Sequence, residues 1–155
     1  MIRSLLAATA VLSLSTAVQA QAPVQTPVAP TQVQPADVAL LLPAQLSPDC
    51  GGLNNLASRA WCVTAPLGQI GALADAYIAD LATKGWLAAG GDENRVVLIK
   101  RREGGGCEGM QMVAFYDTTK TAVAELPGYL GFAVVPGDVC AQAAAEKPAS
   151  ETTPQ

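Results

Sequence analysis

Four cysteines constrain the fold of this chain more than any other feature of its 155 residues. They are Cys50, Cys62, Cys107 and Cys140, and no two of them stand close together in the sequence. A structural zinc site or a thioredoxin-like redox motif needs a closely spaced pair such as Cys-x-x-Cys. The spacing therefore argues against both, and it favours structural disulfide bonds in a protein that matures in an oxidising compartment.

The start of the chain indicates such a compartment. Residues 1–20 carry a basic residue, Arg3, and then an apolar run that ends in small residues, which is typical of a secretory signal peptide. Cleavage is expected after Ala20 or Ala22. The run is shorter than the roughly 20 apolar residues that span a bilayer, so no transmembrane segment is predicted in the mature chain. We expect a bacterial type of export signal and a periplasmic or secreted protein.

Composition separates one domain from two flanking segments. Residues 21–36 are rich in proline and are expected to form an extended, disordered linker, because proline interrupts helices and central strands. Residues 142–155 lack large apolar side chains and are expected to form a disordered C-terminal tail. Residues 37–141 remain as a single small domain.

One long helix is predicted in this domain, from about residue 66 to residue 84. Apolar side chains recur there at helical spacing and form one face. Pro66 suits the first turn, and Gly85 stands where a helix-ending glycine is expected. The apolar positions are Leu67, Ile70, Leu73, Ala74, Tyr77, Ile78 and Leu81.

Short runs of strand-forming residues follow the helix. They cover residues 86–89, 95–101, 109–116 and 129–135. This order predicts an α+β domain with two layers, in which one main helix packs on a three- to four-stranded antiparallel sheet. The apolar segment from Val38 to Leu42 is expected to dock on this core as a short helix or an edge strand.

The strand order also suggests how the cysteines pair. Cys107 precedes the strand 109–116, and Cys140 follows the strand 129–135. If these strands are antiparallel neighbours, the start of one lies beside the end of the other, which brings the two cysteines within bonding range. We therefore predict the disulfides Cys107–Cys140 and Cys50–Cys62.

Two groups of residues are candidates for binding a partner. Lys100, Arg101 and Arg102 form the only basic cluster, which suits an anionic partner such as a phospholipid headgroup, a cell-wall polymer or an acidic protein surface. The simpler interpretation is a solvated strand end whose charge blocks edge pairing. Trp61 and Trp86 either line a ligand groove or hold the helix against the sheet.

The sequence offers little for catalysis or for nucleic-acid binding. It contains no histidine, which removes the usual general base near neutral pH and any Ser–His or Cys–His pair. Its formal net charge of −4 is opposite to what nucleic-acid binding requires. No nucleotide-binding, calcium-binding or serine-nucleophile motif is present, so no cofactor, metal site or catalytic residue is predicted.

These observations favour an exported, non-enzymatic module that binds another envelope protein or an anionic surface polymer. Two alternatives stay open. A histidine-free enzyme would act through carboxylates such as Asp92, Glu93 and Asp117, and it would need a concave pocket that holds two such groups. A purely structural role would make the domain a disulfide-stabilised spacer held by its linker.

Overall fold

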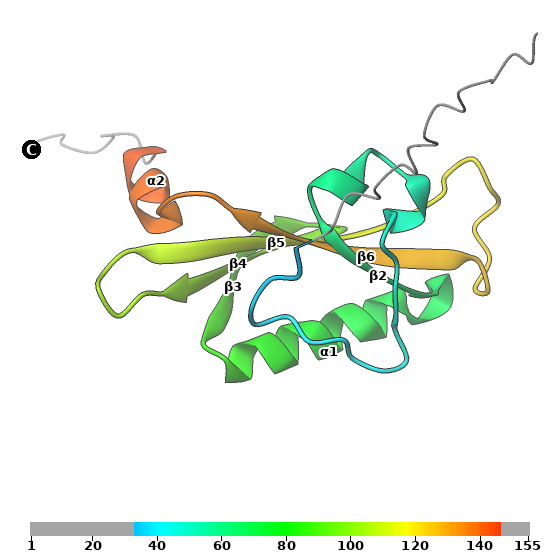
Figure 1. The fold of residues 1–155 in the computed structure, drawn as a ribbon, viewed down its shortest axis with the longest axis horizontal. Coiled ribbons are helices and arrows are strands. Elements are labelled where there is room, and N and C mark those ends of the chain that lie inside the picture. The colour runs from blue at the N-terminus through cyan, green and yellow to red at the C-terminus, as the bar shows by residue number, and fades with distance from the viewer. Residues whose placement is uncertain (1–32, 147–155) are drawn as a thin grey trace, which may run out of the picture.

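The computed structural model describes residues 33–146 (Figure 1). The predicted signal peptide 1–20, most of the predicted linker 21–36 and the end of the predicted tail 142–155 lie outside the described residues. Residues 33–36 of the predicted linker are described. There Pro35 is buried, and its carbonyl accepts a hydrogen bond from the Val38 N–H at 3.0 Å. Pro35, within the range predicted as linker, therefore contacts the domain.

The described residues form one antiparallel sheet covered on one face by a helix. The strands lie in the order β1-β2-β6-β5-β4-β3. Their bounds are β1 Gln45–Leu46, β2 Trp61–Pro66, β3 Trp86–Asp92, β4 Arg95–Arg101, β5 Cys107–Tyr116 and β6 Pro127–Val135. The helices are α1 Ile70–Thr83 and α2 Val139–Glu146, with short 3-10 turns η1 Cys50–Gly52, η2 Leu56–Ser58 and η3 Leu67–Gln69.

The α+β class and the single main helix are confirmed, but the prediction of three to four strands is wrong, because the sheet has six. The main omission is β2, which pairs with β6 in register Val63↔Leu130. Its Cys-Val-Thr run has strand character. No hairpin turn marks the pairing, since the partner strand lies far along the chain. The other omission, β1, is only two residues long.

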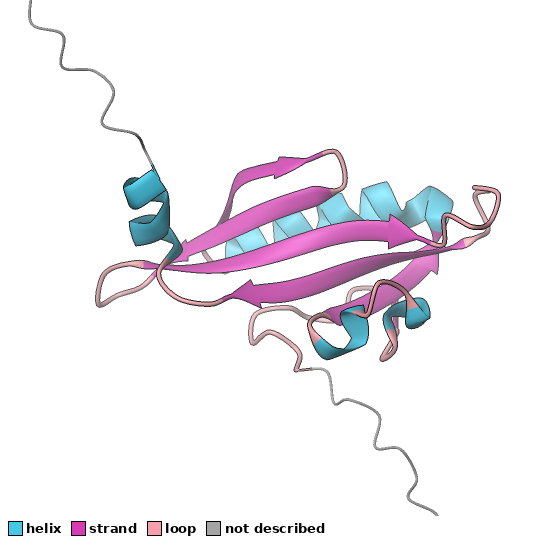
Figure 2. Ribbon diagram, turned by 90° about the horizontal axis from the view of Figure 1, so that it is seen from above, coloured by secondary structure: helices cyan, strands magenta, loops and turns pink. Residues whose placement is uncertain are grey.

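The main helix also begins later than predicted. β2 continues to Pro66, whose ψ of 135° is extended, so α1 starts at Ile70 after the turn η3. Its end agrees with the prediction, since α1 stops at Thr83 and Gly85 follows with a positive φ of 86°. Glycine adopts that conformation without steric cost. α1 connects β2, next to one edge of the sheet, with β3 at the other edge, and it runs along the length of the strands on one face (Figure 2).

The core lies between α1 and the sheet. Alternate residues of the central strands point toward the helix, as the two-residue period of a strand requires. Met110 and Met112 of β5 and Leu130 and Phe132 of β6 are all buried in this layer. Tyr77 of α1 is fully buried against them, with its ring centroid 4.8 Å from that of Phe132.

Within the described part of the chain, the opposite face of the sheet is covered only at its two ends. The turns η1 and η2 stand over one end and α2 over the other (Figure 1). Each cover is joined to the sheet by a disulfide, Cys50–Cys62 with a Cα separation of 5.3 Å and Cys107–Cys140 with 5.4 Å. Both predicted pairings are confirmed. The argument from neighbouring strands holds as well, because β5 and β6 pair from Gly109↔Val135 to Tyr116↔Gly128.

Two local predictions differ from the structure. The segment from Val38 to Leu42 forms neither a helix nor a strand, although Val38 is buried in the core. α2 extends into the predicted tail as far as Glu146, because the bridge to Cys107 holds its first turn against β5. Among the described residues, no helix is both long and apolar enough to cross a membrane.

Candidate functional site

The three residues of the predicted basic cluster do not form a common surface. Lys100 points toward the α1 side of the sheet, where its Nζ lies 2.8 Å from Asp37 Oδ2. Arg102 donates hydrogen bonds to the carbonyls of Cys107 at 3.0 Å and Gly137 at 2.7 Å. Arg101 is exposed and forms no ion pair with any described residue. Only this one guanidinium therefore remains available to an anionic partner.

Lys100 belongs to a polar cluster that closes one end of the helix layer, which we call the closed end. Asp37 Oδ2 accepts hydrogen bonds from Lys100 and from Trp86 Nε1 at 2.9 Å. Lys84 donates to the Asp37 carbonyl at 2.8 Å and pairs with Asp80. The hydrogen bond from Lys100, followed by that from Trp86, lowers the pKa of Asp37. The segment that contains Asp37 is thereby held across the end of α1.

The two tryptophans serve this helix layer. Trp86 is 5% exposed and Trp61 is 4% exposed, and both belong to the core cluster. The ring of Trp61 packs against Phe132, with centroids 5.8 Å apart. Burial of this kind matches the alternative in which tryptophan holds the helix against the sheet. Neither indole is open to a ligand.

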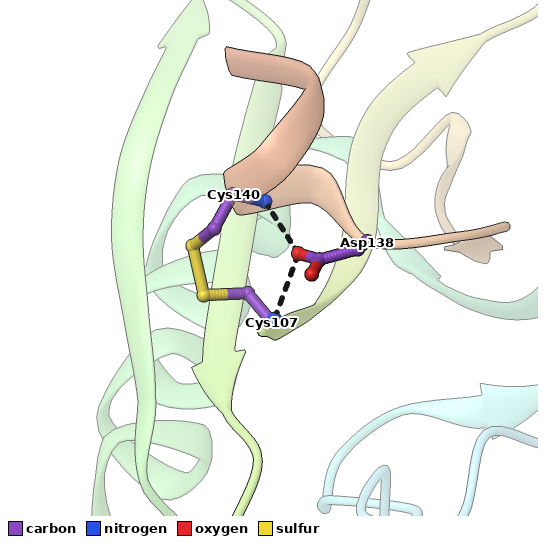
Figure 3. Close-up of side chains that lie close together, drawn as sticks. All are labelled: Cys107, Asp138 and Cys140. Atoms are coloured by element: carbon purple, nitrogen blue, oxygen red, sulfur yellow. Dashed lines mark hydrogen bonds between the residues drawn. A yellow bond between two sulfur atoms is a disulfide. The ribbon is translucent and has the colours of Figure 1, made fainter. Parts of the chain in front are cut away.

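A second polar cluster surrounds the disulfide at α2 (Figure 3). Asp138 Oδ1 accepts hydrogen bonds from the backbone N–H groups of Cys107 at 2.9 Å, Cys140 at 3.1 Å and Ala141 at 3.2 Å. These hydrogen bonds lower the pKa of Asp138, and the bond from the Cys107 N–H makes the largest contribution. Asp138 is therefore the N-cap of α2. Although Cys107, Asp138 and Cys140 gather within metal-binding distance, their sulfurs are joined to each other and present no thiolate.

The carboxylates considered for catalysis are dispersed. Asp92 pairs with Arg95 beside the turn between β3 and β4. Asp117 accepts hydrogen bonds from the Thr119 hydroxyl at 2.6 Å and the Thr119 N–H at 3.1 Å, and it pairs with Lys120. The Thr119 hydroxyl makes the largest contribution to the lowered pKa of Asp117. Asp117 is thus engaged within its own turn.

A hollow lies where β5 extends past β4. It has a volume of about 580 Å³, and we call it the end cleft. The β4–β5 ladder stops at Arg95↔Val113, after which Asn94 accepts the Ala114 N–H at 2.7 Å and donates its side-chain amide to the Ala114 carbonyl at 3.2 Å. Beyond this point, at Phe115 and Tyr116, no strand in the described part of the chain pairs with β5 on that edge. The lining residues are Leu53, Asn54, Leu67, Ile70, Asn94, Ala114, Phe115, Tyr116, Asp117, Thr118 and Thr119.

A smaller hollow of about 260 Å³ adjoins the end cleft, and we call it the side groove. It lies between the helical stripe Ile70, Ala74 and Ile78 and the start of β4, with Met112 and Leu130 in its floor. β3 contributes Gly90 and Gly91 opposite the start of β4, so no large side chain of the edge strand fills this space. The rim carries Asp75, Glu93 and Arg95.

The two hollows are adjacent, because Ile70, Asn94 and Ala114 line both. We call the combined surface the binding cleft. Glu93 lies at the side groove and Asp117 at the end cleft, while Asp92 lines neither. Two of the three carboxylates, Glu93 and Asp117, thus line different parts of the binding cleft, and Asp92 lies outside it.

Comparisons with known proteins give no further guide. No protein-family model matches the sequence, and no curated protein or solved structure is significantly similar to it.

Sequence analysis did not identify the binding cleft. Its walls come from the link between η1 and η2, the start of α1, the β3–β4 turn and the end of β5. From the sequence, Ile70 belongs to the apolar face of the predicted helix, and Asn94 falls between the predicted strands 86–89 and 95–101. No local sequence pattern marks the site, because the site forms where β5 continues beyond the start of its partner strand β4.

Proposed function

We propose that this protein is an exported, non-catalytic module that binds a segment of a partner polypeptide, such as another envelope protein, in the binding cleft. The observation that carries the proposal is the unpaired edge of β5 inside a largely apolar hollow. Clefts of this size with apolar walls and a few polar groups are the usual form of binding sites.

The unpaired edge favours a polypeptide as the ligand. Asn94 and Ala114 are joined by two hydrogen bonds, so in an antiparallel ladder the next backbone groups that point to this edge are those of Tyr116. β4 does not extend to meet them. An extended segment can bond there through its own backbone, and its alternate side chains then reach the apolar walls.

The alternatives from the sequence have less support. An anionic polymer was expected to bind at Lys100, Arg101 and Arg102, but Lys100 and Arg102 already bond within the domain. A carboxylate enzyme needs two such groups in reach of one substrate. Glu93 and Asp117 both line the binding cleft, but they lie in different parts of it, and Asp117 is already bonded to Thr119 and Lys120. A spacer role does not use the cleft at all.

Selection of a displayed library of random dodecapeptides on the oxidised, full mature chain tests the proposal. A photo-crosslinking residue is placed at Thr118, an exposed position of the end cleft, and separately at Glu103, an exposed position at the far end of β4. We expect an enriched peptide that crosslinks from position 118 and not from position 103. Failure to enrich any peptide, or equal crosslinking from both positions, contradicts the proposal.

A further inference from the structure

We propose that the bound segment carries a lysine or arginine beside its apolar anchor, and that the side groove holds this cation between Asp75 and Glu93. The inference rests on the proposed function and names the chemistry of its ligand. It is carried by the juxtaposition of an apolar groove with two carboxylates that form no ion pair within residues 33–146.

Most acidic side chains near the helix layer form an ion pair with a lysine or an arginine. Asp37 pairs with Lys100, Asp80 with Lys84, Asp92 with Arg95 and Asp117 with Lys120. The exceptions at the binding cleft are Asp75, on α1, and Glu93, in the turn between β3 and β4. Both are exposed, and neither forms an ion pair with any described residue.

No basic side chain of the groove neutralises these two charges. Arg95 also lines the side groove, but its guanidinium bonds to Asp92. Asp92 and Arg95 cancel each other, so the rim keeps the negative charge of Asp75 and Glu93. A groove with one sign of charge attracts the opposite sign, and low-dielectric walls strengthen that attraction.

The shape of the side groove suits a long basic side chain. Its floor contains Met112 and Leu130, which are buried, and Val96 and Ile78 flank it. Lysine and arginine place their methylene stems on such apolar surface and keep the charged end at the rim. At about 260 Å³ the groove is smaller than the roughly 300–1,000 Å³ of sites for drug-sized ligands, and it matches one side chain.

The end cleft and the side groove then have different roles in one site. The end cleft offers the unpaired β5 edge and apolar walls, which suit an extended backbone and an apolar anchor. The side groove continues from it past Asn94 and Ala114 and ends in the carboxylates. Successive side chains of the ligand can therefore occupy the two compartments, with the cation on the side of Glu93.

The experiment uses the peptides enriched on the mature protein in the selection described above. We expect lysine or arginine within a few positions of an apolar residue in the enriched sequences. Binding of one such peptide is measured by fluorescence anisotropy to the parent protein, to Glu93→Gln, to Asp75→Asn with Glu93→Gln, and to Glu103→Gln. Glu93→Gln and Glu103→Gln remove the same charge from turns at opposite ends of β4, which makes the second a matched control.

We expect the double variant to bind the peptide about two- to thirtyfold more weakly, the range for two exposed ion pairs, and Glu103→Gln to bind unchanged. Replacing the peptide cation by norleucine, which keeps the stem, causes a similar loss on the parent protein. It causes no further loss on the double variant, because the two changes remove the same interaction. Added salt weakens the parent complex more than the variant complex.

The outcomes separate this inference from the proposed function. Enriched peptides that crosslink from position 118 but contain no cation contradict the inference and leave the proposed function standing. Equal losses in the double variant and in Glu103→Gln also contradict it, because they show a general field and not a bound cation. If no peptide enriches, both proposals fail. Unchanged urea midpoints of the variants show that any loss of binding is not a loss of folding.

Discussion

The two ends of α1 meet the same sheet in opposite ways. At the closed end, Asp37 bonds to Trp86, Lys100 and Lys84, and the segment before β1 covers the junction of helix and sheet. At the other end, which we call the open end, the start of α1 stands over the end of β5 and leaves the binding cleft between them.

The difference shows what the polar groups at each end contribute. Those of the closed end satisfy one another and stabilise the fold, since buried donors left without partners are costly. Asp75 and Glu93 at the open end have no partner among the described residues, so they add little to stability and remain available to a ligand. The predictions below test this contrast, in order of decreasing effect.

Trp86→Ala should destabilise the protein most, because it empties the core at the closed end. Truncation of a buried tryptophan costs about 3–5 kcal/mol. The indole is 5% exposed and also donates to Asp37, so the contacts of that segment are lost with it. Urea unfolding gives the loss in the free energy of unfolding. A loss below about 1 kcal/mol would show that Trp86 is not an anchor of the core.

Each disulfide holds one of the two covers on the opposite face of the sheet, so removing them one at a time compares these covers. Replacing Cys50 and Cys62 by alanine, or Cys107 and Cys140 by alanine, should each lower the free energy of unfolding by about 2–4 kcal/mol. Only the first pair holds the turns that bear Leu53 and Asn54 in the wall of the end cleft.

The two disulfide variants should therefore differ in function. Loss of Cys50–Cys62 should weaken binding of the selected peptide, whereas loss of Cys107–Cys140 should leave it unchanged at temperatures where both variants are folded. Anisotropy titrations measure this. Equal binding by the two variants would show that the turns held by Cys50–Cys62 do not shape the end cleft.

Asp37→Ala and Asp75→Ala compare the carboxylates of the two ends directly. The first leaves the Nε1–H of buried Trp86 without its acceptor, which costs about 1–3 kcal/mol. The second removes an exposed side chain of α1 and should change stability by less than about 0.5 kcal/mol. Parallel urea titrations measure both. Equal effects would mean that the closed end is not a stabilising cluster.

Acidification should remove the contribution of Asp37. The hydrogen bond from Lys100 lowers the pKa of Asp37 below its ordinary value of 3.8. A carboxyl whose pKa is lower in the folded state stabilises fully above the unfolded pKa, and this contribution is lost as the pH falls through the folded pKa. The gap in the free energy of unfolding between the parent protein and Asp37→Ala should be constant from pH 7 to about pH 5 and narrow below about pH 4.

The measurement compares the two proteins in urea across this range of pH. Asp117 and Asp138 also have lowered pKa values and destabilise both proteins equally on acidification, so the difference isolates Asp37. A gap that stays constant to low pH would contradict the role given to the ionised carboxylate.

The predictable parts of this molecule were those with a local signal. The periodicity of Leu73, Tyr77 and Leu81 located the helix, and the positions of Cys107 and Cys140 beside neighbouring strands fixed their pairing. β2 was missed because its pairing with β6 depends on residues far apart in sequence.

The candidate site could not be predicted from the sequence, because it too depends on contacts between residues that are far apart in the chain. Lys100 and Arg102 are adjacent to Arg101 in sequence, but strand alternation and two loops direct their side chains to Asp37 and to the Cys107 and Gly137 carbonyls. A run of charge in a sequence therefore does not establish a charged surface.

The central claim is that the open end of α1 is where this protein binds a partner. The most direct test is a titration of the isotope-labelled protein with the selected peptide, followed by backbone amide and methyl NMR. The largest shift changes are predicted at Ile70, Asn94 and Ala114, which line both parts of the binding cleft. Shift changes that gather instead at Asp37, Trp86 and Arg101 would contradict the claim.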